Sequence, residues 1–306
     1  MKEYESVIIG GGPAGITAAL YLLRAGINVG WVEKLAPGGQ VLLTETIDNY
    51  PGFPQGIHGF ELIDKFTAHL DPFQFDKYRD EVLEIKTLQG KYLVRMAENQ
   101  LTAKTLILSP GAEWRKLGVP GENKYSGRGV SYCAVCDGNF FKGQEVACIG
   151  GGDTALEESL YLSKLVKKIY LIHRRDAFRG AKYYQDKVLS DPKIHVIYDT
   201  VAEAFVGGEL LTGIKLRNVK TDTESLLEVN GAFIFIGLDP AGGFFPPELE
   251  TDPQGFIKTD QEMFTNLPGI FAAGDIRAKN CRQVSTAVGD GATAAYNAHV
   301  YLEQNS

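Results

Sequence analysis

The chain has 306 residues, enough for two ordinary domains or one large α/β unit. Its composition, 44% hydrophobic and 23% charged, is that of a globular protein and excludes a disordered or fibrous one. The net charge is -7 and there is no long basic run, so we expect no nucleic-acid partner. We recognise neither a signal peptide nor an apolar run approaching the roughly 20 residues that span a bilayer, and therefore expect a cytoplasmic protein with no membrane partner.

The first residues are predicted to open a nucleotide-binding unit. An apolar strand ending at Ile9 leads into a glycine turn, and a helix rich in small residues follows from Pro13 and Ala14. Gly10, Gly12 and Gly15 have the spacing in which the first glycine permits a tight turn, the second admits a pyrophosphate and the third lets helix and strand pack closely. Bound phosphates then lie at a helix N-terminus, where unpaired N–H groups favour negative charge.

The next strand, residues 29–32, is followed by Glu33. An acid at this point accepts hydrogen bonds from a ribose in dinucleotide-binding proteins. The alternative is a solvated charge at a strand end.

Cys133 and Cys136 form a Cys-x-x-Cys pair, a spacing that in intracellular proteins serves either metal binding or redox chemistry. Structural zinc needs four ligands, whereas Cys148 and Cys281 are isolated and the nearest histidine, His173, lies in a basic cluster. A buried, inert pair is a second alternative. We favour an exchangeable disulfide with Asp137 as its acid/base, although the spacing does not decide which cysteine attacks the substrate.

The glycine turn recurs, because residues 147–162 repeat residues 7–22 without a gap. The second turn contains Gly150 and Gly152 and continues into Asp153 and Thr154. Two copies in register, each between a strand and a helix, predict two dinucleotide sites. The alternative is a pair of structural turns without ligands.

The strand after the second turn, residues 168–172, ends in a basic cluster instead of an acid: His173, Arg174, Arg175 and Arg179. Because the planar fork of arginine suits a 2′-phosphate, the second nucleotide is predicted to be NADPH and not NADH. A basic surface run is the alternative. NADPH delivers a hydride whereas a disulfide takes electrons through a thiolate, so a flavin is expected to bridge the two.

Late apolar strands at residues 231–237 and 269–275, and a helix that starts near 283–286, indicate an inserted domain. The predicted fold is α/β, with two Rossmann-like, three-layer ββα nucleotide-binding domains. Residues 1–112 and 243–306 form the first domain, and residues 113–242 form the inserted domain that carries the cysteine pair.

The segments GGGPAG (10–15), CAVCDG (133–138), GGGDTA (150–155), HRRDAFR (173–179) and GIFAAGD with a following RQ (269–283) resemble bacterial low-molecular-weight thioredoxin reductases. These belong to the class II pyridine nucleotide-disulfide oxidoreductases. The resemblance covers nearly the whole chain. It implies FAD on the first domain, NADPH on the inserted one, a homodimer, and thioredoxin as the protein substrate reduced through Cys133 and Cys136.

The resemblance also implies site residues. Asp137 is implied as the proton donor and acceptor beside the dithiol, and Cys148 and Cys281 are expected to have no catalytic role. Further residues implied at the FAD are Gly38, Gly39, Gln40, Asn49, Val82, Gly111, Gly274, Asp275, Arg282, Gln283 and Val284. At the NADPH they are Ile236 and Gly237, beside the second glycine turn and the basic cluster.

The dithiol precedes the second glycine turn, so it is carried by the NADPH domain, and the resemblance implies a rotation of that domain about linkers near 112–118 and 240–246. The chain departs from the family pattern at both linkers, with Ser109-Pro110-Gly111 and with residues 238–243.

Three other functions are alternatives to thioredoxin reduction. The first is the flavoprotein of a peroxidase system, but such proteins carry an extra N-terminal redox domain that we do not find. The second is a ferredoxin:NADP reductase, but these lack the dithiol. The third is a non-enzymatic redox sensor.

Overall fold

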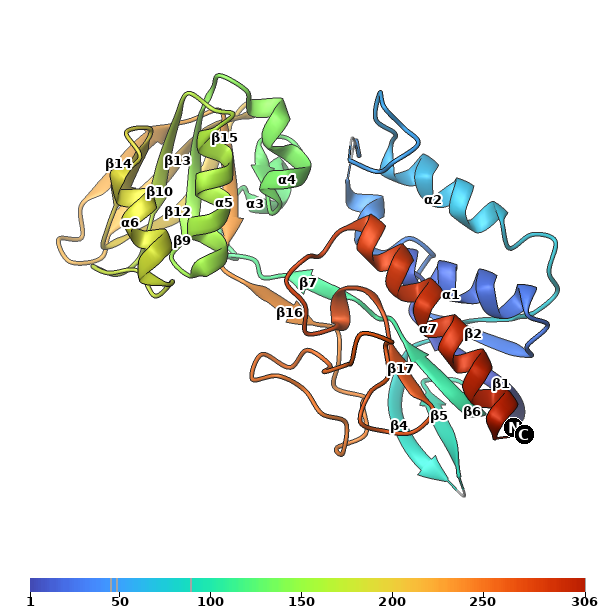
Figure 1. The fold of residues 1–306 in the computed structure, drawn as a ribbon. Coiled ribbons are helices and arrows are strands. Elements are labelled where there is room, and N and C mark those ends of the chain that lie inside the picture. The colour runs from blue at the N-terminus through green and yellow to red at the C-terminus, as the bar shows by residue number, and fades with distance from the viewer. Residues whose placement is uncertain (45, 48, 89, 306) are drawn as a thin grey trace. The chain divides into compact units, whose positions relative to one another are not determined.

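The computed structural model describes residues 1–44, 46–47, 49–88 and 90–305, which fold into two compact units (Figure 1). Unit 1 consists of Met1–Glu113 and Asp239–Ser306, and unit 2 of Trp114–Leu238. The chain therefore leaves unit 1, builds unit 2 as one unbroken stretch, and returns. The predicted boundaries at 112 and 242 lie within a few residues of these points.

Unit 1 is built on a mixed sheet in the order β3-β2-β1-β6-β5-β4, with β17 also paired to β6. Strands β1, β2, β3, β6 and β17 run parallel, while β4, β5 and β6 form an antiparallel meander. The strands are β1 (Lys2–Ile9), β2 (Val29–Glu33), β3 (Asp76–Arg79), β4 (Val82–Leu88), β5 (Lys91–Met96), β6 (Gln100–Leu108) and β17 (Ile270–Ala272).

The side chains of β1 point alternately into two hydrophobic cores, one on each face of the sheet of unit 1. Ile8 belongs to the core shared with the helices, whereas Val7 and Ile9 belong to the core on the other face, because successive side chains of a strand point in opposite directions. The helices of unit 1 are α1 (Pro13–Arg24), α2 (Gly59–Ala68) and α7 (Val284–Gln304), with short 3-10 turns η1 (Gly39–Leu43) and η3 (Gly274–Ile276). Helix α7 begins where the sequence predicts it.

Unit 2 has three layers. A parallel sheet in the order β11-β10-β9-β15-β8 lies between helices and a separate antiparallel sheet, β12-β13-β14. On β9, Cys148 packs toward the helices and Ala147 toward the antiparallel sheet. The strands are β8 (Val130–Ser131), β9 (Glu145–Gly150), β10 (Lys168–Ile172), β11 (Ile194–Ile197), β12 (Thr200–Gly207), β13 (Leu211–Asn218), β14 (Glu224–Glu228) and β15 (Gly231–Phe235). The helices are α3 (Glu122–Tyr125), α4 (Ala134–Asp137), η2 (Gly138–Phe141), α5 (Asp153–Ser163) and α6 (Lys182–Ser190).

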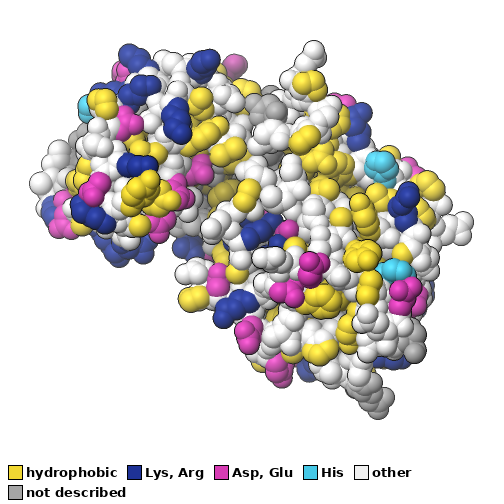
Figure 2. All heavy atoms as spheres, in the orientation of Figure 1, with side chains coloured by type: hydrophobic (Ala, Val, Ile, Leu, Met, Phe, Trp, Pro, Cys, Tyr) yellow, Lys and Arg dark blue, Asp and Glu magenta, His cyan; other side chains and the backbone are white. Residues whose placement is uncertain are grey.

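The two connections between the units are short extended strands, β7 (Ala112–Trp114) and β16 (Leu238–Pro240), which form a two-stranded sheet. Acidic and basic side chains are interspersed on the molecular face drawn in Figure 2. Among the described residues, none of the helices is both long enough and apolar enough to cross a membrane. Within the same residues there is no group of three His, Cys, Asp or Glu side chains that could hold a metal ion.

Candidate functional site

The first glycine turn, between β1 and α1, has the geometry of a phosphate cradle. Gly10 has a φ of 107°, and a Cβ atom there would lie 2.2 Å from the carbonyl oxygen of Ser109. A Cβ atom on Gly15 would lie 1.9 Å from the carbonyl oxygen of Gly10, whereas one on Gly12 would meet nothing within 4 Å. Helix α1 starts after Gly12 with no side chain capping its N–H groups. The turn is thus closed at the first and third glycines and open at the second, where a pyrophosphate would approach.

The second turn, between β9 and α5, repeats this arrangement in unit 2. A Cβ atom on Gly150 would lie 2.4 Å from the carbonyl oxygen of Phe235, and one on Gly152 would again meet nothing within 4 Å. The third position is Ala155, which is fully buried against the turn. Thr154 is exposed in the first turn of α5. Each unit therefore carries one open cradle at a helix N-terminus.

Glu33, at the end of β2, lies beside the first cradle. Its Oε2 accepts a 2.6 Å hydrogen bond from the backbone N–H of Gly11, and its Oε1 accepts one of 2.9 Å from that of Leu35. These bonds hold the carboxylate at the strand end, the place where dinucleotide-binding folds contact a ribose.

The return of the chain into unit 1 supplies a third element of the site. Gly274 has a φ of 79°, and its N–H donates to the buried carboxylate of Asp290 at 3.0 Å. The adjacent Asp275 Oδ1 is buried and has no hydrogen-bond partner among the described residues, and burial raises the pKa of this carboxyl. Lys279 Nζ lies 4.0 Å from this oxygen, beyond hydrogen-bond distance. A buried acceptor that receives no hydrogen bond is the feature expected where a ligand hydroxyl completes the structure. Together with the open cradle at Gly12, it fits the FAD expected on this unit.

Other residues predicted to line the flavin also meet within unit 1. The side-chain amide of Asn49 donates to Gln283 Oε1 at 3.1 Å, and Gln283 caps α7 through a reciprocal capping box with Thr286. Gln40 donates to the carbonyl oxygen of Ala112. Arg282 donates to the carbonyl oxygen of Asp275 at 3.3 Å.

The remaining predicted positions are fixed by backbone or packing. Gly38, Gly39 and Gly111 have positive φ angles, Val82 opens β4 half-buried against the core, and Val284 is the first residue of α7. Ile236 and Gly237 follow β15, and the carbonyl oxygen of Gly237 accepts a hydrogen bond from the N–H of Arg115 at 3.0 Å.

The basic cluster lies beside the second cradle. The N–H groups of Arg179 and Gly180 both donate to the carbonyl oxygen of Gly151, and the N–H of Ala181 donates to Asp153 Oδ1 at 2.6 Å. The side chains of Arg174, Arg175 and Arg179 are exposed, as a group that receives a phosphate must be.

His173 differs from the arginines because it is buried. Its two ring nitrogens lie 3.0 Å from the carbonyl oxygens of Gly150 and Ala177, so the ring links the glycine turn to the loop after β10. Burial, aided by the charges of Arg179 and Arg175, lowers the pKa of the imidazole despite the two carbonyls. Its contact with the nucleotide stays a prediction.

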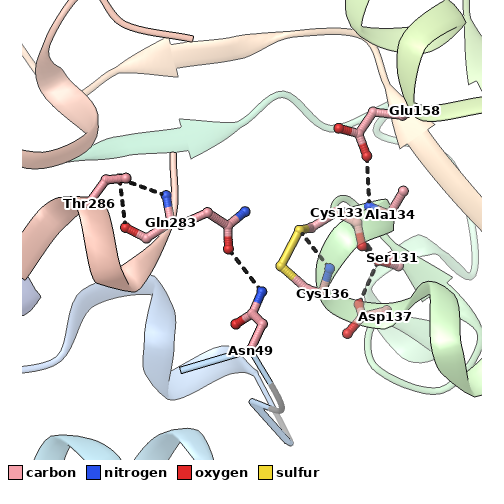
Figure 3. The surroundings of a disulfide bond; sticks show 9 residues. All are labelled: Asn49, Ser131, Cys133, Ala134, Cys136, Asp137, Glu158, Gln283 and Thr286. Atoms are coloured by element: carbon pink, nitrogen blue, oxygen red, sulfur yellow. Dashed lines mark hydrogen bonds between the residues drawn. A yellow bond between two sulfur atoms is a disulfide. The ribbon is translucent and has the colours of Figure 1, made fainter. Parts of the chain in front are cut away.

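Figure 3 shows the sulfur centre of unit 2. Cys133 and Cys136 form a disulfide with a Cα–Cα distance of 5.3 Å, and both are half-buried. Cys133 is the N-cap of α4, and its Sγ accepts a hydrogen bond from the N–H of Cys136 at 3.2 Å. The hydroxyl of Ser131 donates to Asp137 Oδ2 at 2.6 Å, which anchors this carboxylate beside the disulfide.

Comparisons with known proteins agree with this arrangement. The model of the pyridine nucleotide-disulphide oxidoreductase family matches residues 4–291. The chain belongs to this family. A thioredoxin reductase of Listeria monocytogenes is 44% identical over 304 residues, covering 99% of this chain and 95% of that protein. The solved thioredoxin reductase of Streptococcus pyogenes is 42% identical with a TM-score of 0.94, covering 99% of each chain. A ferredoxin-flavin thioredoxin reductase of Clostridium acetobutylicum is 30% identical with a TM-score of 0.55, again over 99% of each chain.

Membership of the family confirms the predicted α/β fold and makes the chain an oxidoreductase that uses FAD and NADPH.

The sequence alone did not predict a role for several residues that contact the sulfur centre. One is Ser131. Another is Glu158, whose carboxylate accepts a 3.2 Å hydrogen bond from the N–H of Ala134, between the cysteines. A third is Tyr132, next to Cys133, whose hydroxyl donates a 2.8 Å hydrogen bond to the buried Glu122. These are single polar side chains at no fixed spacing, so no motif marks them.

Proposed function

We propose that this protein is a thioredoxin reductase, which passes two electrons from NADPH through FAD and the Cys133–Cys136 pair to the disulfide of a thioredoxin. The observation that carries the proposal is the half-buried disulfide of unit 2. Asp137 follows it directly, and the carboxylate of Asp137 accepts a 2.6 Å hydrogen bond from the hydroxyl of Ser131. Sequence relatives over nearly the whole chain have this activity in their names.

The thiol chemistry needs only groups of this chain and the partner's disulfide. In the reduced enzyme, one cysteine thiolate attacks a sulfur of the partner, forms a mixed disulfide and releases a partner thiolate, which takes a proton. The second cysteine then attacks the mixed disulfide, re-forms the Cys133–Cys136 bond and releases the dithiol. We assign the supply and uptake of these protons to Asp137, whose carboxylate accepts a hydrogen bond from Ser131.

The cofactor residues of the proposal are those of the two cradles. FAD, when bound, accepts a hydride and returns an electron pair to a disulfide. Around it the chain would place the turn at Gly10 to Gly15 and the carboxylate of Glu33. The buried Asp275 Oδ1, which accepts no hydrogen bond among the described residues, and the hydrogen-bonded pair of Asn49 and Gln283 complete the set. In unit 2, the turn at Gly150 to Asp153 and the three exposed arginines would hold NADPH.

The test is the loss of thiol chemistry with retention of flavin reduction. In Cys133→Ser and Cys136→Ser, we expect NADPH to bleach the flavin as in the wild type, while thioredoxin reduction falls by about 1000-fold or more because exchange needs both thiols. Cys281→Ser is the matched control: it also removes one sulfur, but an exposed one of unit 1, and activity should be unchanged. Thioredoxin reduction that survives in Cys133→Ser would refute the proposal.

A second candidate differs in the electron donor, because one solved relative is a ferredoxin-flavin thioredoxin reductase. The exposed arginines beside the second cradle favour NADPH. Anaerobic titration of the oxidised flavin with NADPH, NADH and a reduced ferredoxin separates the candidates. Reduction by ferredoxin alone would support the second one.

The proposal includes a rotation of unit 2 about the strands β7 and β16, a homodimer and a cytoplasmic location, all of which come from the family resemblance. A rotation that limits turnover predicts that thioredoxin reduction slows as solvent viscosity rises, while flavin reduction in a single turnover slows less. Equal slowing of both would argue against the rotation. Sedimentation at micromolar concentration tests the dimer.

A further inference from the structure

The carboxylate of Glu158 bonds directly to the backbone between the two cysteines. Glu158 lies in the middle of α5, and its Oε2 accepts a 3.2 Å hydrogen bond from the N–H of Ala134 (Figure 3). Ala134 is fully buried and Glu158 is half-buried, so the contact is partly shielded from water. Asp137 is therefore one of two carboxylates held at the sulfur centre.

This contact removes a donor that would favour a thiolate. Backbone N–H groups at the start of a helical turn stabilise a thiolate at that place and lower its pKa. Here the N–H of Cys136 points to Cys133 Sγ, whereas the N–H of Ala134 is engaged by a carboxylate. The same carboxylate adds a negative charge, which disfavours a second negative charge nearby.

The other titratable groups around Glu158 do not neutralise it. Glu157 adjoins it on α5, and repulsion between the two acids adds to the burial that raises the pKa of Glu158. On β9, burial raises the pKa of the Cys148 thiol to about 12. On α6, the interaction with Glu157 raises the pKa of the Tyr184 hydroxyl, which therefore stays neutral. The segment of α4 contributes the two cysteines and Asp137.

We propose that Glu158 is a positioning residue of the dithiol, which fixes the turn between the cysteines through Ala134 and makes the reduced pair a stronger reductant. The inference rests on the proposed redox role of Cys133 and Cys136. The half-reaction is the disulfide plus two electrons and two protons giving two thiols, with the electrons supplied by NADPH. Ionisation of a thiol stabilises the reduced side, so a carboxylate that opposes ionisation lowers the reduction potential.

The experiment measures the potential of the pair in the FAD-containing enzyme. Wild type, Glu158→Gln and the control Glu224→Gln are equilibrated with dithiothreitol redox buffers at several pH values, quenched with acid and alkylated, and the free thiols are counted by mass spectrometry. Glutamine keeps an oxygen acceptor for Ala134 but carries no charge. Glu224, on β14, is an exposed acid of the same unit.

We expect Glu158→Gln to raise the potential at pH 8 by at least a threefold change in the equilibrium constant, about 14 mV at 29.6 mV per tenfold. The difference should shrink at low pH, where thiols and Glu158 are protonated. In the reduced enzyme, the midpoint of the pH dependence of alkylation should move to lower pH. The control should match the wild type in both measurements.

Glu158→Ala provides the second test, because it removes the charge and the acceptor together, and a rise at least as large is expected. A potential and an alkylation profile equal to those of the wild type in either folded variant overturn the inference. Failure of the proposed function would show separately, as a wild-type enzyme that does not reduce thioredoxin although its Cys133–Cys136 potential can be measured.

Discussion

Arg277 Nη1 lies 2.8 Å from Asp290 Oδ1, and only about a tenth of each side chain is exposed (12% and 10%). Lys279 approaches the other oxygen of Asp290, also at 2.8 Å, and the N–H of Gly274 completes the group. Asp290 thus ties α7 to the loop that holds Asp275, so that a residue outside the predicted site supports a residue inside it.

Asp290→Asn is expected to lower the free energy of unfolding by about 3 kcal/mol, because it removes the carboxylate that two largely buried cations, Arg277 and Lys279, both contact. Asp186→Asn removes one carboxylate from an exposed ion pair with Lys182 on α6 and should cost less than about 1 kcal/mol. Guanidinium denaturation of both FAD-free variants measures the difference. Equal losses would mean that the Asp290 group contributes no more than a surface pair.

The first glycine turn predicts opposite behaviour for two glycine-to-alanine changes. Gly15→Ala places a methyl group 1.9 Å from the carbonyl oxygen of Gly10, so the FAD-free protein should lose about 1–3 kcal/mol or more. Gly12→Ala has room, and its φ of -72° suits alanine, so stability should hold while FAD affinity falls. Thermal unfolding without FAD and titration with FAD separate the two. Unchanged FAD affinity in Gly12→Ala would place the pyrophosphate elsewhere.

The arginine cluster predicts the choice of coenzyme. Replacement of Arg174, Arg175 and Arg179 together by glutamine should lower kcat/KM for NADPH about 100-fold or more, because even one charge-assisted bond to a phosphate contributes roughly 1.5–3 kcal/mol. The value for NADH should change about twofold or less. Lys187→Gln, which removes an exposed cation of α6, is the control. A parallel loss for both coenzymes would indicate a general defect instead of 2′-phosphate recognition.

His173 predicts a loss of stability on acidification. Burial lowers the pKa of its imidazole in the folded protein, so the unfolded chain, near the ordinary value of 6.5, binds the proton more tightly. Stability from this group is therefore complete above pH 6.5 and declines as the pH falls from there toward the folded-state pKa. The melting temperature of His173→Gln should fall less than that of the wild type between pH 7.5 and 5. His195→Gln, at an exposed position on β11, should follow the wild-type curve.

The sequence was sufficient for those parts of the fold and site that depend on backbone geometry. Gly10 and Gly150 mark tight turns, and the apolar run before each of them predicts a parallel strand. The cysteine pair and the fold class followed from spacing and from the resemblance. The strand pairings of β12 to β14 are set by tertiary packing and carry no such mark.

The sequence did not reveal how the sulfur centre is held. Glu158 reaches Ala134 because α5 packs against α4, and Ser131 reaches Asp137 because β8 ends beside the same turn. Such contacts depend on where two elements meet in space, and a single polar residue leaves no periodic signal. His173 illustrates the converse: it stands in a basic motif, yet its ring is buried beneath the glycine turn.

The split course of unit 1 bears on the order in which a ribosome can deliver a foldable protein. Helix α7 packs so closely on α1 that a Cβ atom on Gly291 would lie 2.2 Å from the carbonyl oxygen of Ala14, and β17 adds to β6 only after the chain has returned. Every strand of unit 2 is synthesised before these two elements. The part of α1 that packs against α7 therefore stays uncovered through most of translation. Until the last helix has been made, the first segment of unit 1 exposes this apolar surface to chaperones and to aggregation.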